Sequence, residues 1–387
     1  MVKYNCLNPI AKEGLDLLGD NFAATEDFND AEVVLVRSAS MHEMELPGKL
    51  VAVARAGAGV NNIPLDKCAD QGIVVFNTPG ANANAVKELV IAGILLASRD
   101  IVGGVNWGLA NKDDENLAKS VEKSKKQFAG CEIKGKKLGV IGLGAIGVLV
   151  ANAAVALGME VYGCDPFISV ENAWKLSRAV VHVNTREEIF ANCDYITIHT
   201  PLLDSTKKMI NDETIAMMKD GVVILNYARD LLVDEEAIAK ALESGKVGKY
   251  MTDFINPNTV KMVNTVATPH LGASTKESED NCAVMAAKEL KAYVEQGNII
   301  NSVNFPALDA GICKTAARIC ILHKNIPNML SQFTAAFAGL NVNIENMYNK
   351  SRGDYAYSVL DVVAKVGDKT YDTIKSIDGV LRVRVIQ

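Results

Sequence analysis

The chain has 387 residues, of which 49% are hydrophobic and 22% charged, so a globular protein of two or three domains is expected. The formal net charge of -6 at pH 7 argues against nucleic acid as a partner. No apolar run reaches the roughly 18 residues of a membrane span, and the first residues lack the apolar core of a signal peptide. The eight cysteines contain no C-x-x-C pair, which predicts reduced thiols in a cytoplasmic protein.

Short apolar runs alternate with helical patterns over most of the chain, which is typical of α/β domains with parallel sheets. Three buried strands are predicted near the start, at 33–36, 51–54 and 72–77. An apolar helix is predicted at 85–98, and a polar, highly charged stretch at 111–126 is expected at the surface. These elements predict one parallel-sheet domain in the first hundred residues.

A second unit follows the polar stretch. It begins with a strand at 136–141 and includes further buried strands at 195–198 and 222–225. A long helix is predicted at about 276–295, and Gly297 ends it.

The last part of the chain has a pattern of its own. The segment 298–315 contains Pro306 and Gly311 without clear periodicity, which indicates a linker. The residues after it have the order β-α-β-β-α-β, the split βαβ arrangement of ferredoxin-like domains. The expected strands lie near 317–322, 342–348, 356–363 and 380–386, and the expected helices near 328–338 and 370–376.

A G-x-G-x-x-G motif follows the strand at 136–141 and opens a helix. Its residues are Gly142, Gly144, Ala145, Ile146 and Gly147. Glycines allow the tight turn and the close approach of a pyrophosphate, and the helix N-terminus supplies N–H donors. Asp165 ends the next strand eighteen residues past Gly147, where an acidic residue accepts hydrogen bonds from ribose hydroxyls. No arginine follows Asp165 to bind a 2′-phosphate, so NAD is favoured over NADP.

Oxidation of a secondary alcohol with a nicotinamide needs a base for the hydroxyl proton and a cation for the substrate's oxygens. Of the five histidines, His270 is the best candidate base, because it lies on a Pro- and Gly-flanked loop after a strand of the nucleotide-binding unit. His199 stands at a strand end before Thr200 and Pro201, where we expect these residues to line the cofactor.

Several further motifs carry a family resemblance. They are ARAGAGVNNI at 54–63, NTPGAN at 77–82, the glycine loop, NYAR at 226–229, VDE at 233–235 and PHLGAST at 269–275. Together they resemble the D-isomer-specific 2-hydroxyacid dehydrogenases, and among them the D-3-phosphoglycerate dehydrogenases, over essentially the whole chain.

The resemblance implies a fold class and an activity. The fold is α/β, with two Rossmann-like or flavodoxin-like parallel-sheet domains and a C-terminal ferredoxin-like (βαββαβ) ACT domain. The activity is NAD-dependent oxidation of 3-phospho-D-glycerate to 3-phosphohydroxypyruvate, the first step of L-serine biosynthesis, in a homodimer or homotetramer. The implied domains are a discontinuous substrate-binding domain (1–98 and 283–305), an NAD-binding Rossmann domain (99–282), a linker (306–315) and an ACT regulatory domain (316–387).

The resemblance also implies roles for single residues. Arg229 would bind and polarise the substrate, His270 would exchange the C2 hydroxyl proton, and Ala228 would border the cofactor. The implied substrate-binding residues are Arg55, Ala56 and Gly57, with Asn82, Arg37 and Lys125 or Lys126 as weaker candidates.

One family residue is missing. Relatives carry a glutamate that orients the catalytic histidine, whereas this chain has no glutamate between Glu243 and Glu277. Asn256 and Asp253 are the two candidates for its place, and no metal site is expected.

The C-terminal unit carries a further implied site. By resemblance, His323, Asn325 and Asn343 match positions that bind L-serine between paired ACT domains, with a dimerising module that binds nothing as the alternative. Two other functions stay open for the whole chain: action on another D-2-hydroxy acid, and an NAD-sensing binding protein on the same scaffold.

Overall fold

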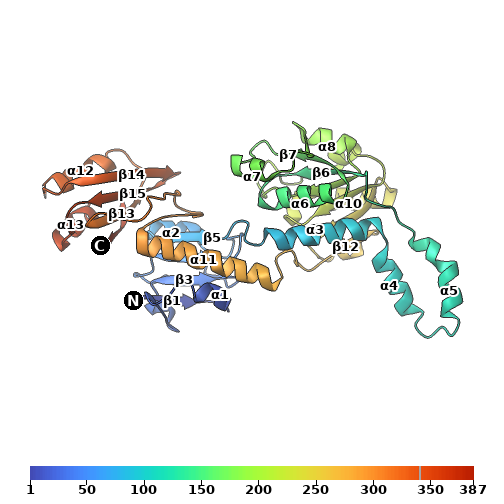
Figure 1. Ribbon diagram of the computed structural model, residues 1–387, viewed down its shortest axis with the longest axis horizontal. Helices are drawn as coiled ribbons and strands as arrows, with labels where there is room; N and C mark the ends of the chain where they lie inside the picture. Colours follow the sequence, from blue (N-terminus) through green and yellow to red (C-terminus); the bar gives the residue numbers. More distant parts are fainter. Residues whose placement is uncertain (340) are drawn as a thin grey trace. The chain divides into compact units, whose positions relative to one another are not determined.

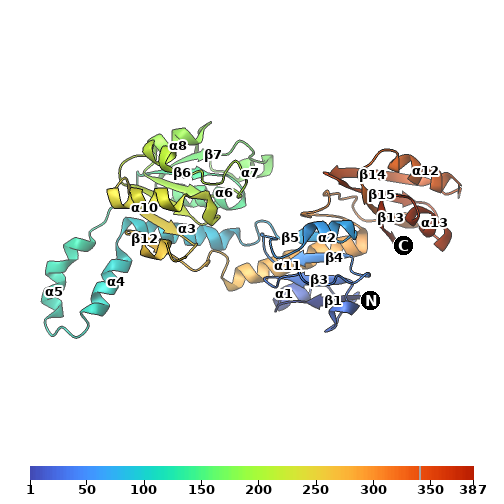
Figure 2. The ribbon, with the colours of Figure 1, turned by 180° about the vertical axis from the view of Figure 1, so that it is seen from behind.

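The computed structural model describes residues 1–339 and 341–387, which form two compact units (Figures 1 and 2). The first unit comprises Met1–Asn82 and Lys276–Gln387, and the second comprises Ala83–Thr275. Across the described residues, no helix combines the length and the apolar character that a membrane span requires.

The first unit contains a five-stranded parallel sheet of order β2-β1-β3-β4-β5. The strands are β1 (Val2–Cys6), β2 (Phe22–Ala24), β3 (Val33–Val36), β4 (Ala52–Arg55) and β5 (Val74–Asn77). Its helices are α1 (Lys12–Leu15), η1 (Phe28–Asp30), α2 (Leu65–Asp70) and α11 (Lys276–Gln296). The predicted strands β3, β4 and β5 and the predicted helix α11 are confirmed. The strands β1 and β2 were not predicted, because Lys3 and Asn5 interrupt the apolar run of β1 and β2 has only three residues.

An antiparallel sheet of order β14-β15-β13-β16 forms the C-terminal part of the same unit. Its strands are β13 (Ala317–Lys324), β14 (Ile344–Arg352), β15 (Tyr355–Val362) and β16 (Val380–Ile386), and its helices are α12 (Met329–Gly339) and α13 (Asp368–Lys375). The predicted β-α-β-β-α-β order is confirmed. The α12 and α13 side chains Phe333, Phe337 and Ile374 cover one face of this sheet.

The other face of the antiparallel sheet shares a hydrophobic core with the rest of the first unit. Leu322 and Tyr357 of the sheet belong to the same buried cluster as Leu290 and Tyr293 of α11 and Phe76 of β5. Burial of such apolar side chains stabilises by about 25 cal/mol per Å² removed from water. The C-terminal sheet is therefore packed against the rest of the first unit and is not merely tethered to it.

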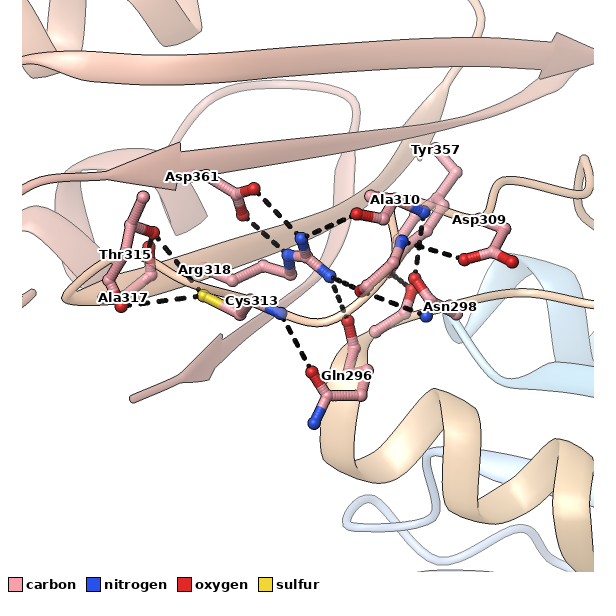
Figure 3. A network of polar contacts seen from close by, with 12 residues as sticks. Gln296, Asn298, Asp309, Ala310, Cys313, Thr315, Ala317, Arg318, Tyr357 and Asp361 are labelled. Atoms are coloured by element: carbon pink, nitrogen blue, oxygen red, sulfur yellow. Dashed lines mark hydrogen bonds and ion pairs between the residues drawn. The ribbon is translucent and has the colours of Figure 1, made fainter.

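A buried ion pair reinforces this packing (Figure 3). The Arg318 guanidinium donates to both carboxylate oxygens of Asp361, over 2.6 and 2.9 Å. It also donates to the backbone carbonyls of Gln296, Ala310 and Gly311. One side chain thus joins the sheet, the C-terminal end of α11 and the segment that connects them.

Glu289 of α11 is a buried carboxyl group, 4% exposed. Its Oε1 accepts a 2.7 Å hydrogen bond from Asn301 Nδ2, whereas Oε2 has no hydrogen-bond partner among the described residues. Burial, which disfavours the charged form, raises the pKa of Glu289 to about 8, against the smaller opposing effect of the Asn301 hydrogen bond. The folded protein therefore holds a proton here at neutral pH.

This proton predicts a pH-dependent stability. Between the unfolded pKa of about 4.3 and the folded value, the folded state binds one more proton than the unfolded state. Glu289 makes its full contribution to the free energy of unfolding below about pH 4.3. As the pH rises through this window, that contribution falls by about 1.4 kcal/mol per pH unit. Urea denaturation at pH 5, 6.5 and 8 measures this effect. The free energy of unfolding of Glu289→Gln, relative to that of the wild type, should increase as the pH rises. A constant difference across the three pH values would contradict the buried proton.

The second unit contains a seven-stranded, all-parallel sheet of order β12-β11-β10-β9-β6-β7-β8. Its strands are β6 (Lys137–Ile141), β7 (Glu160–Cys164), β8 (Val181–His182), β9 (Tyr195–Ile198), β10 (Val222–Asn226), β11 (Val247–Thr252) and β12 (Thr265–Ala267). Its helices are α3 (Ala83–Ser98), α4 (Ile101–Ala110), α5 (Leu117–Ser124), η2 (Lys125–Phe128), α6 (Ala145–Ala156), α7 (Val170–Lys175), α8 (Arg186–Asn192), α9 (Asp212–Ala216), η3 (Asp230–Leu232), α10 (Glu235–Ser244) and η4 (Thr259–Lys261). The predicted strands β6, β9 and β10 are confirmed.

The compact units divide at residues 82 and 275, earlier than the domain boundaries at 98 and 282 expected from the sequence. The reason is α3, whose side chains Val86, Val90 and Ile94 pack in one core with Val148 and Ala151 of α6. The finer division into a substrate-binding domain, a linker and a separate C-terminal domain stays a prediction.

The α-helices α4 and α5 and the 3-10 helix η2 extend away from the sheet of the second unit as an arm (Figures 1 and 2). The helix α4 was not predicted. It begins at Asp100, whose side chain accepts a hydrogen bond from the Gly103 N–H. Trp107 of α4 packs against Phe128 of η2, with ring centroids 6.2 Å apart. The arm thus has a small contact of its own and no buried residue in either α4 or α5.

Candidate functional site at the carboxyl edge of the parallel sheet

Because all seven strands of the second unit run parallel, their carboxyl ends meet at one edge of the sheet, where ligands of open α/β sheets bind. Most of the predicted cofactor and catalytic residues follow these strand ends. Gly142 follows β6, Asp165 follows β7, His199 follows β9, Arg229 follows β10 and His270 follows β12.

The glycine loop fits a pyrophosphate. Gly142 has φ +93°, and a Cβ added there would lie 2.8 Å from the backbone of His199. A Cβ at Gly147 would lie 1.9 Å from the Gly142 carbonyl oxygen, whereas one at Gly144 would meet nothing within 4 Å. The loop therefore leaves open backbone at Gly144, where the first N–H groups of α6, at Ala145 and Ile146, are available to an anion.

Asp165 joins the ends of two strands. Its Oδ2 accepts a 2.8 Å hydrogen bond from the Leu143 N–H in the glycine loop, and its Oδ1 accepts one from the Phe167 N–H. Each carboxylate oxygen can accept a further hydrogen bond, so the group can hold ribose hydroxyls while fixing the loop.

The predicted cofactor-lining residues after β9 are uncharged. Burial lowers the pKa of His199 to about 3, and its Nε2 is hydrogen-bonded to Thr197 Oγ1 over 2.9 Å. Thr200 Oγ1 donates to the Met209 sulfur, and the Pro201 carbonyl accepts from Thr206. His199 therefore stays neutral and contributes no cation to this edge.

The loop that carries Arg229 is fixed by the fully buried Asn226 at the end of β10. Asn226 Oδ1 accepts from the Ala228 N–H, and Nδ2 donates to the Arg229 carbonyl over 2.8 Å. The Arg229 side chain is exposed, and its Nη1 donates to the Ala228 carbonyl. The guanidinium is thus presented to solvent from a rigid turn.

The loop that carries His270 is fixed by Asp253, which directly follows β11. The buried carboxylate accepts hydrogen bonds from Thr268 Oγ1 (2.6 Å) and from the N–H groups of Leu271 and Gly272 (both 2.7 Å). The His270 N–H donates to the Asp253 carbonyl over 3.0 Å. His270 has φ +59°, in the left-handed region that non-glycine residues seldom adopt, and this network holds it there.

Phe254, the next residue, contacts the His270 ring itself. The two rings meet edge-on at 80°, with centroids 5.4 Å apart. This contact was missed in the sequence analysis, although the position beside the strand-end Asp253 could have indicated it.

Asn256, one of the two candidates for the family glutamate's place, is occupied elsewhere. Its Nδ2 donates to Glu235 at the start of α10, and its Oδ1 accepts from the N–H groups of Asn258 and Thr259. Asn258 donates to the same Glu235 carboxylate. Glu235 belongs to the VDE motif at 233–235, but its contact with Asn256, 21 residues later in the chain, arises only through the fold.

The predicted substrate arginines of the first unit lie at the carboxyl edge of its own sheet. Arg55 ends β4, and its Nε donates to the Arg37 carbonyl over 3.1 Å. Gly57 has φ +153°, and a Cβ there would lie 2.5 Å from Arg55 Nη1. The Arg37 side chain is paired with Glu279 of α11. Ala56, which lies between Arg55 and Gly57 in the chain, is buried.

The remaining predicted residues are more scattered. Asn82 is half-buried at the end of the first segment, and Lys125 lies on η2 of the arm, paired with Glu122. His323 is 2% exposed, with Nδ1 bonded to the Lys324 carbonyl and Nε2 to Ser358 Oγ.

Asn325 donates to the Gly353 carbonyl, and Asn343 is exposed. None of these contacts tests the predicted roles. Among the described residues, no group of three or more His, Cys, Asp or Glu side chains could hold a metal ion.

Comparison with known proteins places this site in a family. Residues 104–272 match the family described as D-isomer specific 2-hydroxyacid dehydrogenase, NAD binding domain. A D-3-phosphoglycerate dehydrogenase of Haemophilus influenzae is 33% identical over 358 residues, covering 89% of this chain and 83% of that protein. One of Bacillus subtilis is 36% identical over 310 residues, covering 77% of this chain but 56% of that protein, about half its length.

Solved structures agree. The NAD⁺-bound 3-phosphoglycerate dehydrogenase of Entamoeba histolytica is 29% identical, with a TM-score of 0.61 over 79% of this chain and 99% of that one. A D-isomer specific 2-hydroxyacid dehydrogenase of Lactobacillus delbrueckii ssp. bulgaricus has a TM-score of 0.64 at 21% identity, over 78% of this chain and 100% of that one, which shows a shared fold. The chain belongs to the D-isomer specific 2-hydroxyacid dehydrogenase family.

Proposed function

We propose that the chain catalyses the NAD-dependent oxidation of 3-phospho-D-glycerate to 3-phosphohydroxypyruvate, the first step of L-serine biosynthesis. The observation that carries the proposal is that the glycine loop, Arg229 and His270 follow strands of one parallel sheet and so share its carboxyl edge. The relatives from H. influenzae and B. subtilis, both D-3-phosphoglycerate dehydrogenases, support the choice of substrate.

In this proposal each residue has one task. Arg229 binds the substrate carboxylate and polarises the C2 oxygen. The imidazole of His270 accepts the C2 hydroxyl proton and returns it in the reverse reaction. Gly144 and the first turn of α6 hold the cofactor's pyrophosphate, and Asp165 its ribose. NAD, when bound, supplies the acceptor for the hydride that leaves C2.

Asp253 serves in this account as a positioning residue for His270. Its buried carboxylate accepts three hydrogen bonds from the His270 loop, two at Oδ1 and one at Oδ2, so it is held against that loop. Asp253→Ala should lower kcat by about 10- to 100-fold, because a displaced catalytic group loses its near-attack geometry. The Kd of NADH, measured by fluorescence, should change less than about twofold. Thr268→Val, which removes one of the three donors, is the milder control.

Asp253→Asn separates positioning from proton exchange. The account predicts a pH–rate profile of unchanged shape and lower amplitude. A profile that loses one limb in Asp253→Asn would instead make Asp253 a proton-exchanging group.

A second candidate function is an NAD-sensing binding protein on the same scaffold. The observation in its favour is that Asn256, one of the two candidates for the place of the family glutamate, carries an amide and not a carboxylate, and this amide is bound to Glu235. Incubation with NAD and 3-phospho-D-glycerate, beside D-lactate as a second D-2-hydroxy acid, decides between the functions. NADH formation with 3-phospho-D-glycerate supports the first proposal, formation only with D-lactate favours another substrate, and none with either favours the sensor.

We also propose that the chain forms a homodimer or homotetramer, and the arm supports this. An α-helix that is apolar all round is normally buried, yet Val105 and Leu109 of α4 are 56% and 65% exposed in the single chain. Val105→Glu/Leu109→Glu should therefore yield monomers in analytical ultracentrifugation. The control is Val170→Glu, at an exposed valine of α7 outside the arm. An unchanged sedimentation coefficient in the double variant would remove the arm from the interface.

For the C-terminal sheet we propose an ACT regulatory domain that binds L-serine. Its element order supports the domain type, and the exposed amides of Asn325 and Asn343 suit the ammonium and carboxylate of an amino acid. His323 is buried with both ring nitrogens engaged, so Asn325 and Asn343 carry the direct contacts in this proposal. Calorimetry with L-serine tests it: no heat and unchanged kinetics at millimolar serine would leave a packing module that binds nothing.

A cytoplasmic location completes the proposal. All eight cysteines are free thiols, and five of them are buried. Free thiols are the state expected in a reducing compartment.

A further inference from the structure

We infer that Asn8 is a positioning residue for the substrate-binding arginine Arg55, acting through the loop at residues 37–39. Asn8 lies two residues beyond β1, and β1 is the neighbour of β3 in the sheet. Its Oδ1 accepts hydrogen bonds from three consecutive N–H groups, those of Arg37 (3.0 Å), Ser38 (3.0 Å) and Ala39 (2.9 Å). The inference rests on the proposed function, in which Arg55 binds the anionic substrate.

Three successive N–H groups that converge on one oxygen form a concave nest, a geometry that prefers a negatively polarised atom at its centre. The Asn8 oxygen supplies that atom. It therefore fixes the backbone just after β3, including the direction of the Arg37 carbonyl.

The Arg37 carbonyl in turn orients Arg55. Arg55 Nε donates to it over 3.1 Å. Gly57 leaves room for the guanidinium beside this hydrogen bond, since a Cβ at Gly57 would lie only 2.5 Å from Arg55 Nη1. The hydrogen bond at Nε thus holds one edge of the guanidinium. A planar fork binds a carboxylate or phosphate in two parallel hydrogen bonds only when its plane is correctly oriented.

Arg37 contributes through its backbone in this arrangement. Its guanidinium is paired with Glu279 of α11, whereas its carbonyl faces Arg55. Substitution of Arg37 leaves its backbone carbonyl in place. The hydrogen bond between this carbonyl and Arg55 is therefore tested by substituting Asn8, which orients the carbonyl.

The second unit uses the same device at its functional edge. Asp165 fixes the glycine loop after the neighbouring strand β6, and Asp253 fixes the His270 loop after the neighbouring strand β12. In each case an acceptor side chain just beyond one strand holds N–H groups beyond the adjacent strand. Asn8 is the first unit's counterpart.

The test compares four proteins: the wild type, Asn8→Leu, Asn8→Asp and Asn5→Ala. Asn8→Leu removes the acceptor at similar volume, whereas Asn8→Asp keeps an oxygen for the three donors. Asn5→Ala is the matched control, because Asn5 lies on β1, the strand that Asn8 follows, and its Nδ2 donates to the carbonyls of Thr25 and Glu26.

Asn8→Leu should raise the KM for 3-phosphohydroxypyruvate roughly tenfold, the loss of one well-oriented charged contact, with the KM for NADH and kcat within about twofold. Asn8→Asp and Asn5→Ala should keep the wild-type substrate KM within about threefold. An unchanged KM in Asn8→Leu, equal impairment of Asn8→Leu and Asn8→Asp, or an equal rise in Asn5→Ala would each overturn the inference.

A crystal structure of Asn8→Leu gives a readout that does not depend on turnover. The inference predicts that Arg55 Nε leaves the Arg37 carbonyl, and an Arg55 in its original place would overturn it. A wild type that reduces no 2-oxo acid would sink the proposed function instead, and the crystal structure would still decide the positioning.

Discussion

Substituting His270 by asparagine is expected to lower kcat by about 10²- to 10⁴-fold, because the substrate loses the group that exchanges its C2 hydroxyl proton. Asparagine is the informative replacement. His270 has φ +59°, and asparagine tolerates this left-handed conformation better than most residues, so the loop held by Asp253 should keep its shape. The loss then reports on the imidazole and not on the backbone.

Two measurements accompany the rate. The Kd of NADH should stay within about twofold of the wild type, because the glycine loop and Asp165 lie beyond other strands of the sheet. His182→Asn is the matched control, an exposed histidine on β8 of the same unit, and should keep full activity. A kcat within about threefold of the wild type in His270→Asn would remove His270 from the chemistry.

Replacing Arg318 by methionine is expected to lower the free energy of unfolding by about 3–5 kcal/mol, the cost of leaving one partner of a buried ion pair alone. The variant leaves the buried Asp361 carboxylate unpaired and takes a donor from three backbone carbonyls at the end of α11 and in the segment after it (Figure 3). Because this sheet shares its core with α11, the loss should appear in the transition of the whole first unit. Urea denaturation measures it.

A double-mutant cycle identifies the ion pair as the cause. Arg318→Met/Asp361→Leu removes both charges. The free energy of unfolding that this double variant loses should be at least about 2 kcal/mol smaller than the sum of the losses in the two single variants. Lys175→Met, which breaks a fully exposed pair with Glu171, is the control and should leave the transition unchanged. A stable Arg318→Met with an unchanged urea midpoint would contradict the account of how the C-terminal sheet is joined.

Most of the fold was predictable because its elements have strong periodic patterns. The strands β3, β6, β9 and β10 are short apolar runs buried on both faces, and the β-α-β-β-α-β order of the C-terminal sheet follows from equally clear runs. The strand β1 was missed because Lys3 and Asn5 interrupt its apolar pattern, and β2 because it has only three residues. Pairing within the sheet selects the extended conformation of both strands. The helix α4 was missed because its glycines disfavour a helix locally.

The site was predictable at the level of strand ends and not at the level of contacts. Gly142, Arg229 and His270 could be assigned to one edge because each follows a parallel strand. The partner of Asn256 could not be predicted, because Glu235 comes from another element and meets it only once both loops are folded. The role of Asp253 likewise depends on N–H groups beyond the neighbouring strand, whose direction no sequence pattern encodes.

The most direct test of the proposed activity compares kcat/KM for NADH-dependent reduction of 3-phosphohydroxypyruvate and of hydroxypyruvate, which differ only in the phosphate group. A charge-assisted contact contributes about 1.5–3 kcal/mol, and each 1.4 kcal/mol is a factor of ten. A preference of at least about tenfold for the phosphorylated substrate is therefore expected. Equal values, or a preference for hydroxypyruvate, would contradict it.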